Sequence, residues 1–126
     1  MDDLIMEWIK FSDRDLETAK YLHENMRPQP LEIICYLCQQ TAEKALKAFL
    51  IYSGIKPEKT HDLEILTDKC VVVDDSFNEI FENCSRLNRY SSQPRYPFEI
   101  EITDGDTILA LQSGNKINEF VKIKII

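Results

Sequence analysis

The sequence predicts an all-α fold, a single up-down antiparallel bundle of four to five helices. Apolar residues recur every three or four positions along most of the chain, and breaks rich in Pro, Gly and capping residues separate these stretches. With 126 residues, of which 44% are hydrophobic, the chain can fill one core, so we expect one domain over residues 1–126. Short connections favour antiparallel neighbours.

Two long helices are expected first. Small and apolar side chains predict a helix over about residues 2–26, which Pro28 ends because proline cannot continue a helix. The same periodicity predicts a second helix over about residues 31–52, with a stop at Gly54.

Two shorter helices should follow. Thr60 is a candidate N-cap for the third, which should end near residues 71–73. Residues 76–79, Ser-Phe-Asn-Glu, have the pattern of a capping box and should open the fourth helix, which Pro94 prevents from continuing.

The last part of the chain is less regular. Residues 98–103 alternate strictly between apolar and polar, which by itself favours a strand, but no pairing partner is evident, so we interpret them as an extended connector. Apolar residues between about 108 and 121 predict a last helix, weakened by Ser113-Gly114-Asn115 at its middle.

Charge and hydropathy limit the class of protein. With 22 acidic against 15 basic side chains the net charge is -7, so the average field repels phosphate, and nucleic-acid binding would need a local basic patch. No segment approaches the ~18 apolar residues of a membrane span, and the start Met-Asp-Asp lacks the basic region of a secretory signal. We expect a cytoplasmic protein without membrane contact.

Four cysteines, Cys35, Cys38, Cys70 and Cys84, are expected to be free thiols. Cys35 and Cys38 have the spacing of redox and zinc motifs, but at helical spacing both lie on an apolar face, and no second close pair completes a zinc site. We therefore assign no metal and no cofactor.

Two groups of polar residues are candidate sites. Gln40, Lys44 and Lys47 lie at i, i+4 and i+7 on one face of the second helix, where they would hold an anion. The alternative is a solvated face on which Glu43 pairs with Lys47.

The second group is the local basic and aromatic cluster. Arg86 and Arg89 share a face of the fourth helix, and Tyr90, Arg95 and Tyr96 follow closely. Arg suits phosphate and Tyr suits base stacking, but both types are also enriched at protein interfaces, so a homodimer contact is an equal alternative.

Several of these segments together resemble the HEPN domain family (higher eukaryotes and prokaryotes nucleotide-binding). The resemblance covers about residues 2–98 and rests on residues 15–19, 36–48, 60–63, 87–90 and 95–97. It implies a compact bundle of four or five helices that forms a two-fold homodimer. It also implies a minimal nucleotidyltransferase partner in a toxin–antitoxin-like pair.

Many members of that family are metal-independent ribonucleases, with a signature of Arg, a polar residue, several spacers and His. Here the only histidines, His23 and His61, precede Arg86, so the signature is missing and we assign no catalytic residue. His61 lies in the motif Thr60-His61-Asp62-Leu63, which we interpret as a structural helix start; the alternative is that it reaches the cleft.

Three functional hypotheses follow. The first is a non-catalytic dimeric module that binds a minimal nucleotidyltransferase. The second is a nucleotide- or RNA-binding domain, and the third is a degenerate ribonuclease that uses His61 or a Tyr hydroxyl. Tyr90 and Tyr96 are also candidate acceptors of a transferred nucleotide.

Overall fold

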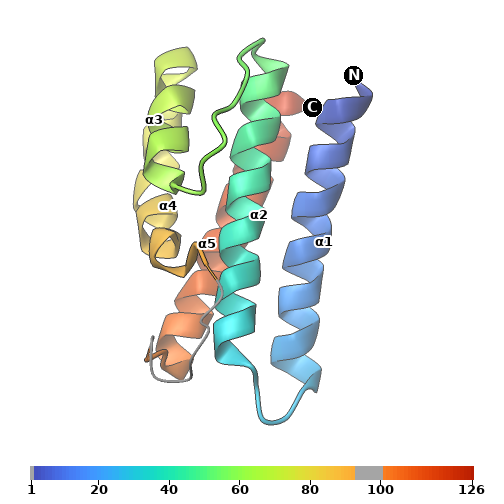
Figure 1. Cartoon of the computed structure of the whole chain (residues 1–126), viewed down its shortest axis with the longest axis vertical. Helices are drawn as coiled ribbons and strands as arrows, with labels where there is room; N and C mark the ends of the chain where they lie inside the picture. Colours follow the sequence, from blue (N-terminus) through green and yellow to red (C-terminus); the bar gives the residue numbers. More distant parts are fainter. Residues whose placement is uncertain (1, 93–100) are drawn as a thin grey trace.

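The chain folds as a bundle of helices, with no strand among the residues that are described (Figure 1). The computed structural model describes residues 2–92 and 101–126. The predicted all-α class is therefore confirmed. In chain order the elements are α1 (Asp3–Asn25), α2 (Leu31–Tyr52), α3 (Leu63–Val73), the 3-10 helix η1 (Asp75–Ile80), α4 (Phe81–Leu87), the 3-10 helix η2 (Asn88–Tyr90) and α5 (Asp104–Ile125).

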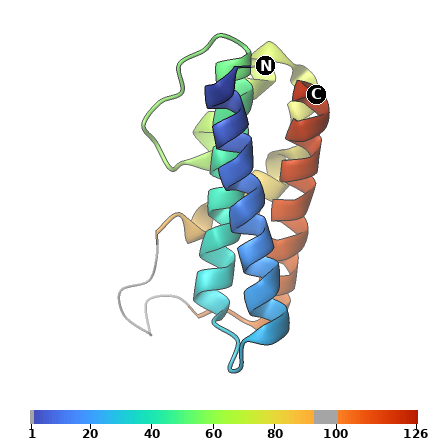
Figure 2. The same ribbon diagram turned by 90° about the vertical axis from the view of Figure 1, so that its right-hand side faces the viewer.

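The three long helices α1, α2 and α5 pack side by side. α1 runs antiparallel to both α2 and α5, which run parallel to each other (Figures 1 and 2). Buried Ser12 of α1 donates a hydrogen bond to the backbone oxygen of Thr41 in α2 at 2.8 Å and accepts one from Asn118 of α5 at 3.0 Å. Because a hydroxyl can donate and accept at once, this one side chain fixes the register of all three helices.

The connection between α2 and α3, residues 53–62, runs back along α2 instead of turning sharply. The side chain of Gln39 bonds the backbone oxygen of His61, while the Cys70 thiol lies 3.9 Å from the backbone oxygen of Leu46. The start of α3 thus lies beside the middle of α2, and its end lies beside a later part of α2. As a result α3 runs in the same direction as α2, although the two are consecutive (Figure 1).

The starts of the two shorter helices differ from the sequence prediction. Asp62, not Thr60, caps α3: its Oδ1 accepts from the backbone N–H groups of Glu64 and Ile65, and the Thr60 hydroxyl accepts from Asp62. Asp74 likewise accepts from both the backbone N–H and the hydroxyl of Ser76, so the capping box predicted at residues 76–79 is wrong. In both places a carboxylate, the stronger acceptor, takes the position predicted for a hydroxyl.

α5 is longer than predicted and passes through Gly114 without a break. Thr103 and Asp106 form a capping box that starts it before the predicted position. A Cβ atom built on Gly114 would lie 3.4 Å from Cys38 Cβ and 3.5 Å from Cys38 Cα. The glycine therefore marks a close approach of α5 to α2, and the continuous packing of the two helices outweighs its low helix propensity.

This geometry predicts that two substitutions at Gly114 differ in their effect on the free energy of unfolding. Gly114→Ala adds a methyl group at contact distance and gains helix propensity, so we expect the free energy of unfolding to stay within about 1 kcal/mol of the unsubstituted protein. Gly114→Leu forces α5 away from Cys38 and should cost about 1–3 kcal/mol. Urea denaturation of both variants checks this, and equal costs would contradict the close approach.

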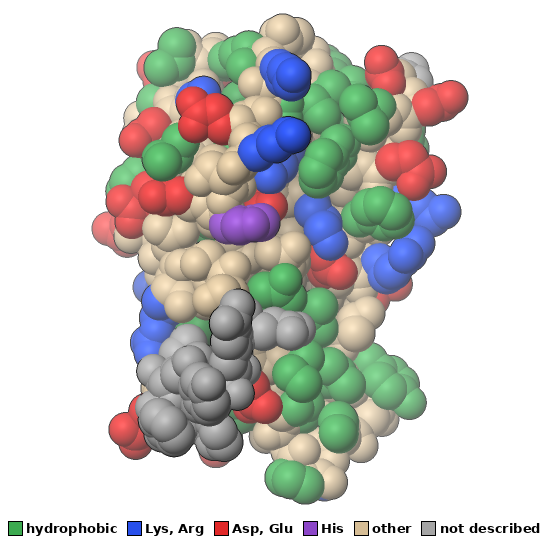
Figure 3. All heavy atoms as spheres, viewed as in Figure 1, with side chains coloured by type: hydrophobic (Ala, Val, Ile, Leu, Met, Phe, Trp, Pro, Cys, Tyr) green, Lys and Arg blue, Asp and Glu red, His purple; other side chains and the backbone are tan. Residues whose placement is uncertain are grey.

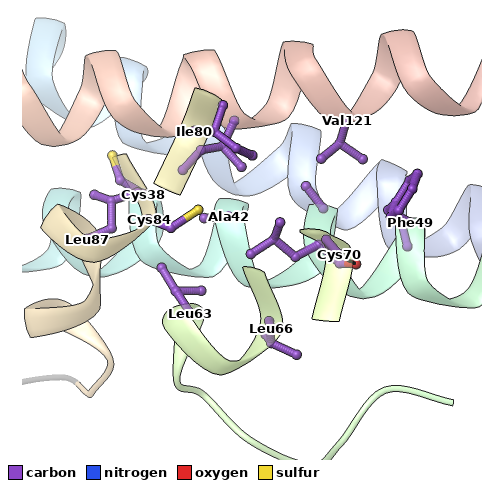
Figure 4. Packing of buried hydrophobic residues seen from close by; sticks show 14 of the residues in the cluster. Cys38, Ala42, Phe49, Leu63, Leu66, Cys70, Ile80, Cys84, Leu87 and Val121 are labelled. Carbon is purple, nitrogen blue, oxygen red and sulfur yellow. Dashed lines mark hydrogen bonds between the residues drawn. The ribbon is translucent and has the colours of Figure 1, made fainter. Parts of the chain in front are cut away.

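The core lies between α2 and the elements around it. Figure 4 shows Cys38 and Ala42 of α2 close to Cys84 and Leu87 of α4, with Leu63, Leu66 and Cys70 of α3 in the same cluster and Phe49 farther along α2. At one end of this core the ring of Phe77 packs between Phe49, at a centroid distance of 4.4 Å, and Phe120, at 5.0 Å.

All four cysteines are buried free thiols, as predicted. Burial raises the pKa of the Cys84 thiol to about 12 and raises the pKa values of Cys35, Cys38 and Cys70 as well. These thiols therefore stay protonated and behave as small apolar side chains.

Two further expectations concern membrane-spanning helices and the connector at residues 98–103. None of the described helices is both long enough and apolar enough to cross a membrane. Of the connector predicted over residues 98–103, the first part lies outside the described residues, and residues 101–103 have no regular structure.

Candidate functional site

A polar cluster lies where the 53–62 connection meets the middle of α2. It consists of Gln39, Glu43 and Lys47, from one face of α2, and His61 from the connection. The two Glu43 carboxylate oxygens contact different side chains: Oε2 lies 3.0 Å from Lys47 Nζ, and Oε1 lies 2.9 Å from His61 Nδ1. Gln39 donates to Oε1 at 3.3 Å.

The burial of this cluster differs from the prediction for its face of the helix. The Glu43–Lys47 pair is present as one of the two alternatives predicted, but Glu43 is only 5% and Lys47 only 8% exposed, so the face is not solvated. Lys47 also lies 5.9 Å from the centroid of the Trp8 ring on α1. The charged pair is therefore enclosed by protein, where ionic contacts matter more than at a surface.

The environment of Glu43 favours its charged form. Burial alone would raise the pKa of the Glu43 carboxyl, because the charge loses solvation. The hydrogen bonds from Lys47 and His61 outweigh that effect, and the pKa is lowered from its ordinary value. The cluster therefore contains a stable carboxylate at neutral pH.

A second set of hydrogen bonds fixes the residues just after His61. The Asn88 side chain accepts from the backbone N–H of Leu63 at 2.9 Å and donates to Asp62 at 3.1 Å. Together with the bond from Gln39 to the His61 backbone oxygen at 3.0 Å, these contacts hold the start of α3 against α2 and η2. This geometry agrees with the interpretation of residues 60–63 as a structural helix start.

Sequence reasoning missed the roles of Gln39 and Asn88. Both are neutral amides, which carry no charge pattern or helix periodicity that would mark them. Each provides both a donor and an acceptor, which suits a residue that must satisfy exposed backbone groups of another segment. The only signal was that each lies within a segment on which the family resemblance rests.

The imidazole of His61 faces outward from this cluster. Its side chain is 71% exposed, and Nδ1 is the ring nitrogen that contacts Glu43. Nε2 has no hydrogen-bond partner among the described residues. When Nδ1 donates to a carboxylate, Nε2 carries the lone pair and can accept a proton.

The predicted anion site on α2 is divided between two ion pairs. Lys44 is bound by Asp15 of α1, whereas Lys47 is bound by Glu43, and Gln40 donates to Gln39. Each lysine is thus neutralised by a carboxylate. Figure 3 shows this mixture of basic and acidic side chains around a histidine.

The predicted Arg and Tyr cluster is only partly described. Arg86 of α4 donates to Ser113 of α5 at 3.0 Å, whereas Arg89, in η2, donates weakly to the backbone oxygen of Glu101 at 3.4 Å. Arg89 also lies 5.0 Å from the centroid of the Tyr90 ring. The two guanidinium groups therefore contact different elements. Arg95 and Tyr96 lie outside the described residues.

Tyr90 is part of the core. It is 3% exposed, and burial raises the pKa of its hydroxyl to about 12. A buried, protonated hydroxyl is a poor nucleophile, and a buried ring offers no face to a base. Neither base stacking nor nucleotide acceptance is favoured at Tyr90.

This chain is similar to one protein family and to two solved structures. The HEPN domain family matches residues 5–124. The crystal structure of ST0689, an archaeal HEPN homologue, is similar with 26% identity and a TM-score of 0.74, covering 97% of this chain and 98% of that one. TT1696 from Thermus thermophilus has the same fold, with 23% identity, a TM-score of 0.75 and coverage of 95% and 97%. The curated proteins give no match.

Proposed function

Because the chain belongs to the HEPN domain family, we propose that it is a non-catalytic dimeric module that binds a minimal nucleotidyltransferase in a toxin–antitoxin-like pair. We place this pair in the cytoplasm. The sequence supports the non-catalytic part, because both histidines precede every arginine of the predicted basic cluster and the ribonuclease signature of the family is missing.

The observation that carries the proposal is the internal pairing of the candidate cations. Lys44 and Lys47 are each paired with a carboxylate that neutralises their charge, whereas Arg86 keeps its charge and donates a hydrogen bond to Ser113 of α5. A site that binds phosphate needs cations whose charge is not already neutralised. The two lysines are instead used in ion pairs within the fold, and Arg86 joins α4 to α5, which favours a structural and protein-binding role.

Co-expression with the minimal nucleotidyltransferase from a neighbouring gene tests the proposal. We expect a stable complex on size-exclusion chromatography with light scattering, and a dimer of this chain when it is purified alone. A monomer that does not co-purify with the nucleotidyltransferase would contradict both parts.

His61 supports a second candidate function, a degenerate ribonuclease. Buried Glu43 orients the imidazole through Nδ1, and the exposed Nε2 is available for proton transfer. Carboxylate–imidazole pairs of this kind serve as general bases in hydrolytic enzymes.

Single-stranded RNA distinguishes the two candidates. If His61 is catalytic, the purified protein cleaves the RNA and His61→Ala lowers the rate by about 100-fold or more, as expected for loss of a general base. His23→Ala is the matched control, since His23 lies at the end of α1 and outside the cluster. Intact RNA with all three proteins would leave the interaction module as the function.

A further inference from the structure

A depression at one end of the bundle is not explained by the polar cluster. It has a volume of about 600 Å³ and is open to solvent. Figures 1 and 2 show that α2, α3 and α5 all end on this side of the molecule. We call it the end pocket, and it is lined by Phe49, Tyr52, Ser53, Val71, Val72, Val73, Asp74, Asp75 and Lys124.

The end pocket is electronegative. Neither α2 nor α3 has a basic residue in its last turn, and the last turn of a helix carries a partial negative charge. The backbone oxygens of residues 71–73 accept no backbone N–H from the described part of the chain. Asp74 and Asp75 add two carboxylates, against one cation, Lys124, which lies 3.0 Å from Asp74.

The charge of Asp74 persists at all physiological pH values. Hydrogen bonds from Ser76 and Lys124 lower the pKa of this carboxyl to about 2. Asp75 is exposed and makes no ion pair with any described residue. It is therefore free to meet a cation from another molecule.

Apolar side chains surround these charges. Val72 is 87% exposed, Tyr52 49% and Val73 44%, and all three line the end pocket. Single exposed apolar residues are common, but three around one depression indicate a surface that is covered in a complex. A Tyr ring beside carboxylates also suits a cation, which its π-face attracts.

We propose that the end pocket docks a segment of the partner protein that carries an Arg or Lys between apolar side chains. The inference rests on the proposed function, since it names the surface through which this chain holds its partner. The basic group meets Asp75 and the backbone oxygens at the end of α3, and the apolar neighbours cover Val72 and Tyr52.

Charge argues against a second copy of this chain as the occupant. In a two-fold dimer the same patch faces itself, so the end pocket would set two electronegative surfaces against each other. A small amine is also a poor match, because an open depression would not enclose it and the valines would stay in water. A protein segment satisfies both the charge and the apolar surface.

Titration calorimetry with the purified minimal nucleotidyltransferase tests the docking surface. Asp75→Lys should weaken binding about tenfold or more, and Val72→Ser should weaken it severalfold. Asp68→Lys is the matched control, since it makes the same charge change at an exposed site on α3. Equal effects of Asp75→Lys and Asp68→Lys, or none, would overturn the docking surface and leave the proposed partner in place.

A peptide probe tests the end pocket even if the nucleotidyltransferase does not bind. The ¹⁵N-labelled protein is titrated with acetyl-Leu-Val-Arg-Val-Leu-amide and with the same peptide carrying Glu in place of Arg, up to about 5 mM to detect weak binding. Shifts at residues 71–75 with the Arg peptide alone would support the end pocket independently of that partner. No shift there, or equal shifts with both peptides, would overturn it.

Discussion

Glu43→Ala is expected to lower the free energy of unfolding by about 3–5 kcal/mol, because it leaves the charge of Lys47 buried without a counter-ion. Lys47 is 8% exposed, and Glu43 is its ion-pair partner among the described residues. The substitution also releases His61, so one of the contacts that hold the 53–62 connection on α2 is lost. Urea denaturation measures the change.

Two controls separate burial of the charge from loss of the contact itself. Replacing both partners, as in Glu43→Leu with Lys47→Met, removes the unpaired charge and should recover most of the stability. Glu58→Ala breaks the Glu58–Lys69 pair at the surface and should cost about 1 kcal/mol or less. If Glu43→Ala costs no more than Glu58→Ala, the buried pair does not stabilise the fold.

The same carboxylate predicts a pH dependence. The folded-state pKa of Glu43 is lowered, so its contribution is fully present above the ordinary pKa of 4.5 and is lost as the pH falls through the folded-state value. The difference in stability between the unsubstituted protein and Glu43→Gln, measured by urea denaturation, should therefore shrink as the pH falls below the ordinary pKa of 4.5.

Phe77→Ala is expected to cost about 3–5 kcal/mol, since it opens a cavity between the rings of Phe49 and Phe120. Phe77 is fully buried and joins η1 to Phe49 of α2 and Phe120 of α5. For a domain of this size the loss should lower the melting temperature by about 10 °C or more.

Phe11→Ala provides the matched control for this substitution. Phe11 is 39% exposed on α1, and its truncation leaves no closed cavity, so we expect a cost of about 1 kcal/mol or less. Equal decreases in melting temperature for the two variants would show that the three-ring contact is not a stabilising centre of the core.

The helices α1 and α2 could be predicted from the sequence, whereas the starts of the later helices and the path of the connections could not. Apolar periodicity over more than twenty residues determined α1 and α2 to within one residue. Thr60 and Asp62, and Asp74 and Ser76, are pairs of capping residues two positions apart, and periodicity cannot choose between members of such a pair. Tertiary contacts and the strength of the acceptor determine which member of each pair caps the helix.

The candidate site was likewise predicted only in part from the sequence. The spacing of Glu43 and Lys47 predicted their pairing, but not their burial, which depends on the path of a connection with no helical pattern of its own. Gly114 was interpreted as a weak point of the last helix, because its contact with Cys38 involves a segment far away in the sequence. Local sequence patterns indicate the secondary structure that a segment favours, and tertiary packing determines the structure and burial that it adopts.

The Asn88 contacts have a consequence for how the molecule opens. Asn88 binds Asp62 and Leu63, so the chain enters and leaves the α3–η1–α4 hairpin at a single point, closed by one amide side chain. Opening of this hairpin would expose the core residues that it buries, but it would leave the direct contacts among α1, α2 and α5 in place. Amide hydrogen exchange in residues 63–87 should then follow a common opening free energy, smaller than that of α2. We therefore expect two units of different stability, the three long helices and the α3–η1–α4 segment, with Asn88 joining the two ends of the second unit.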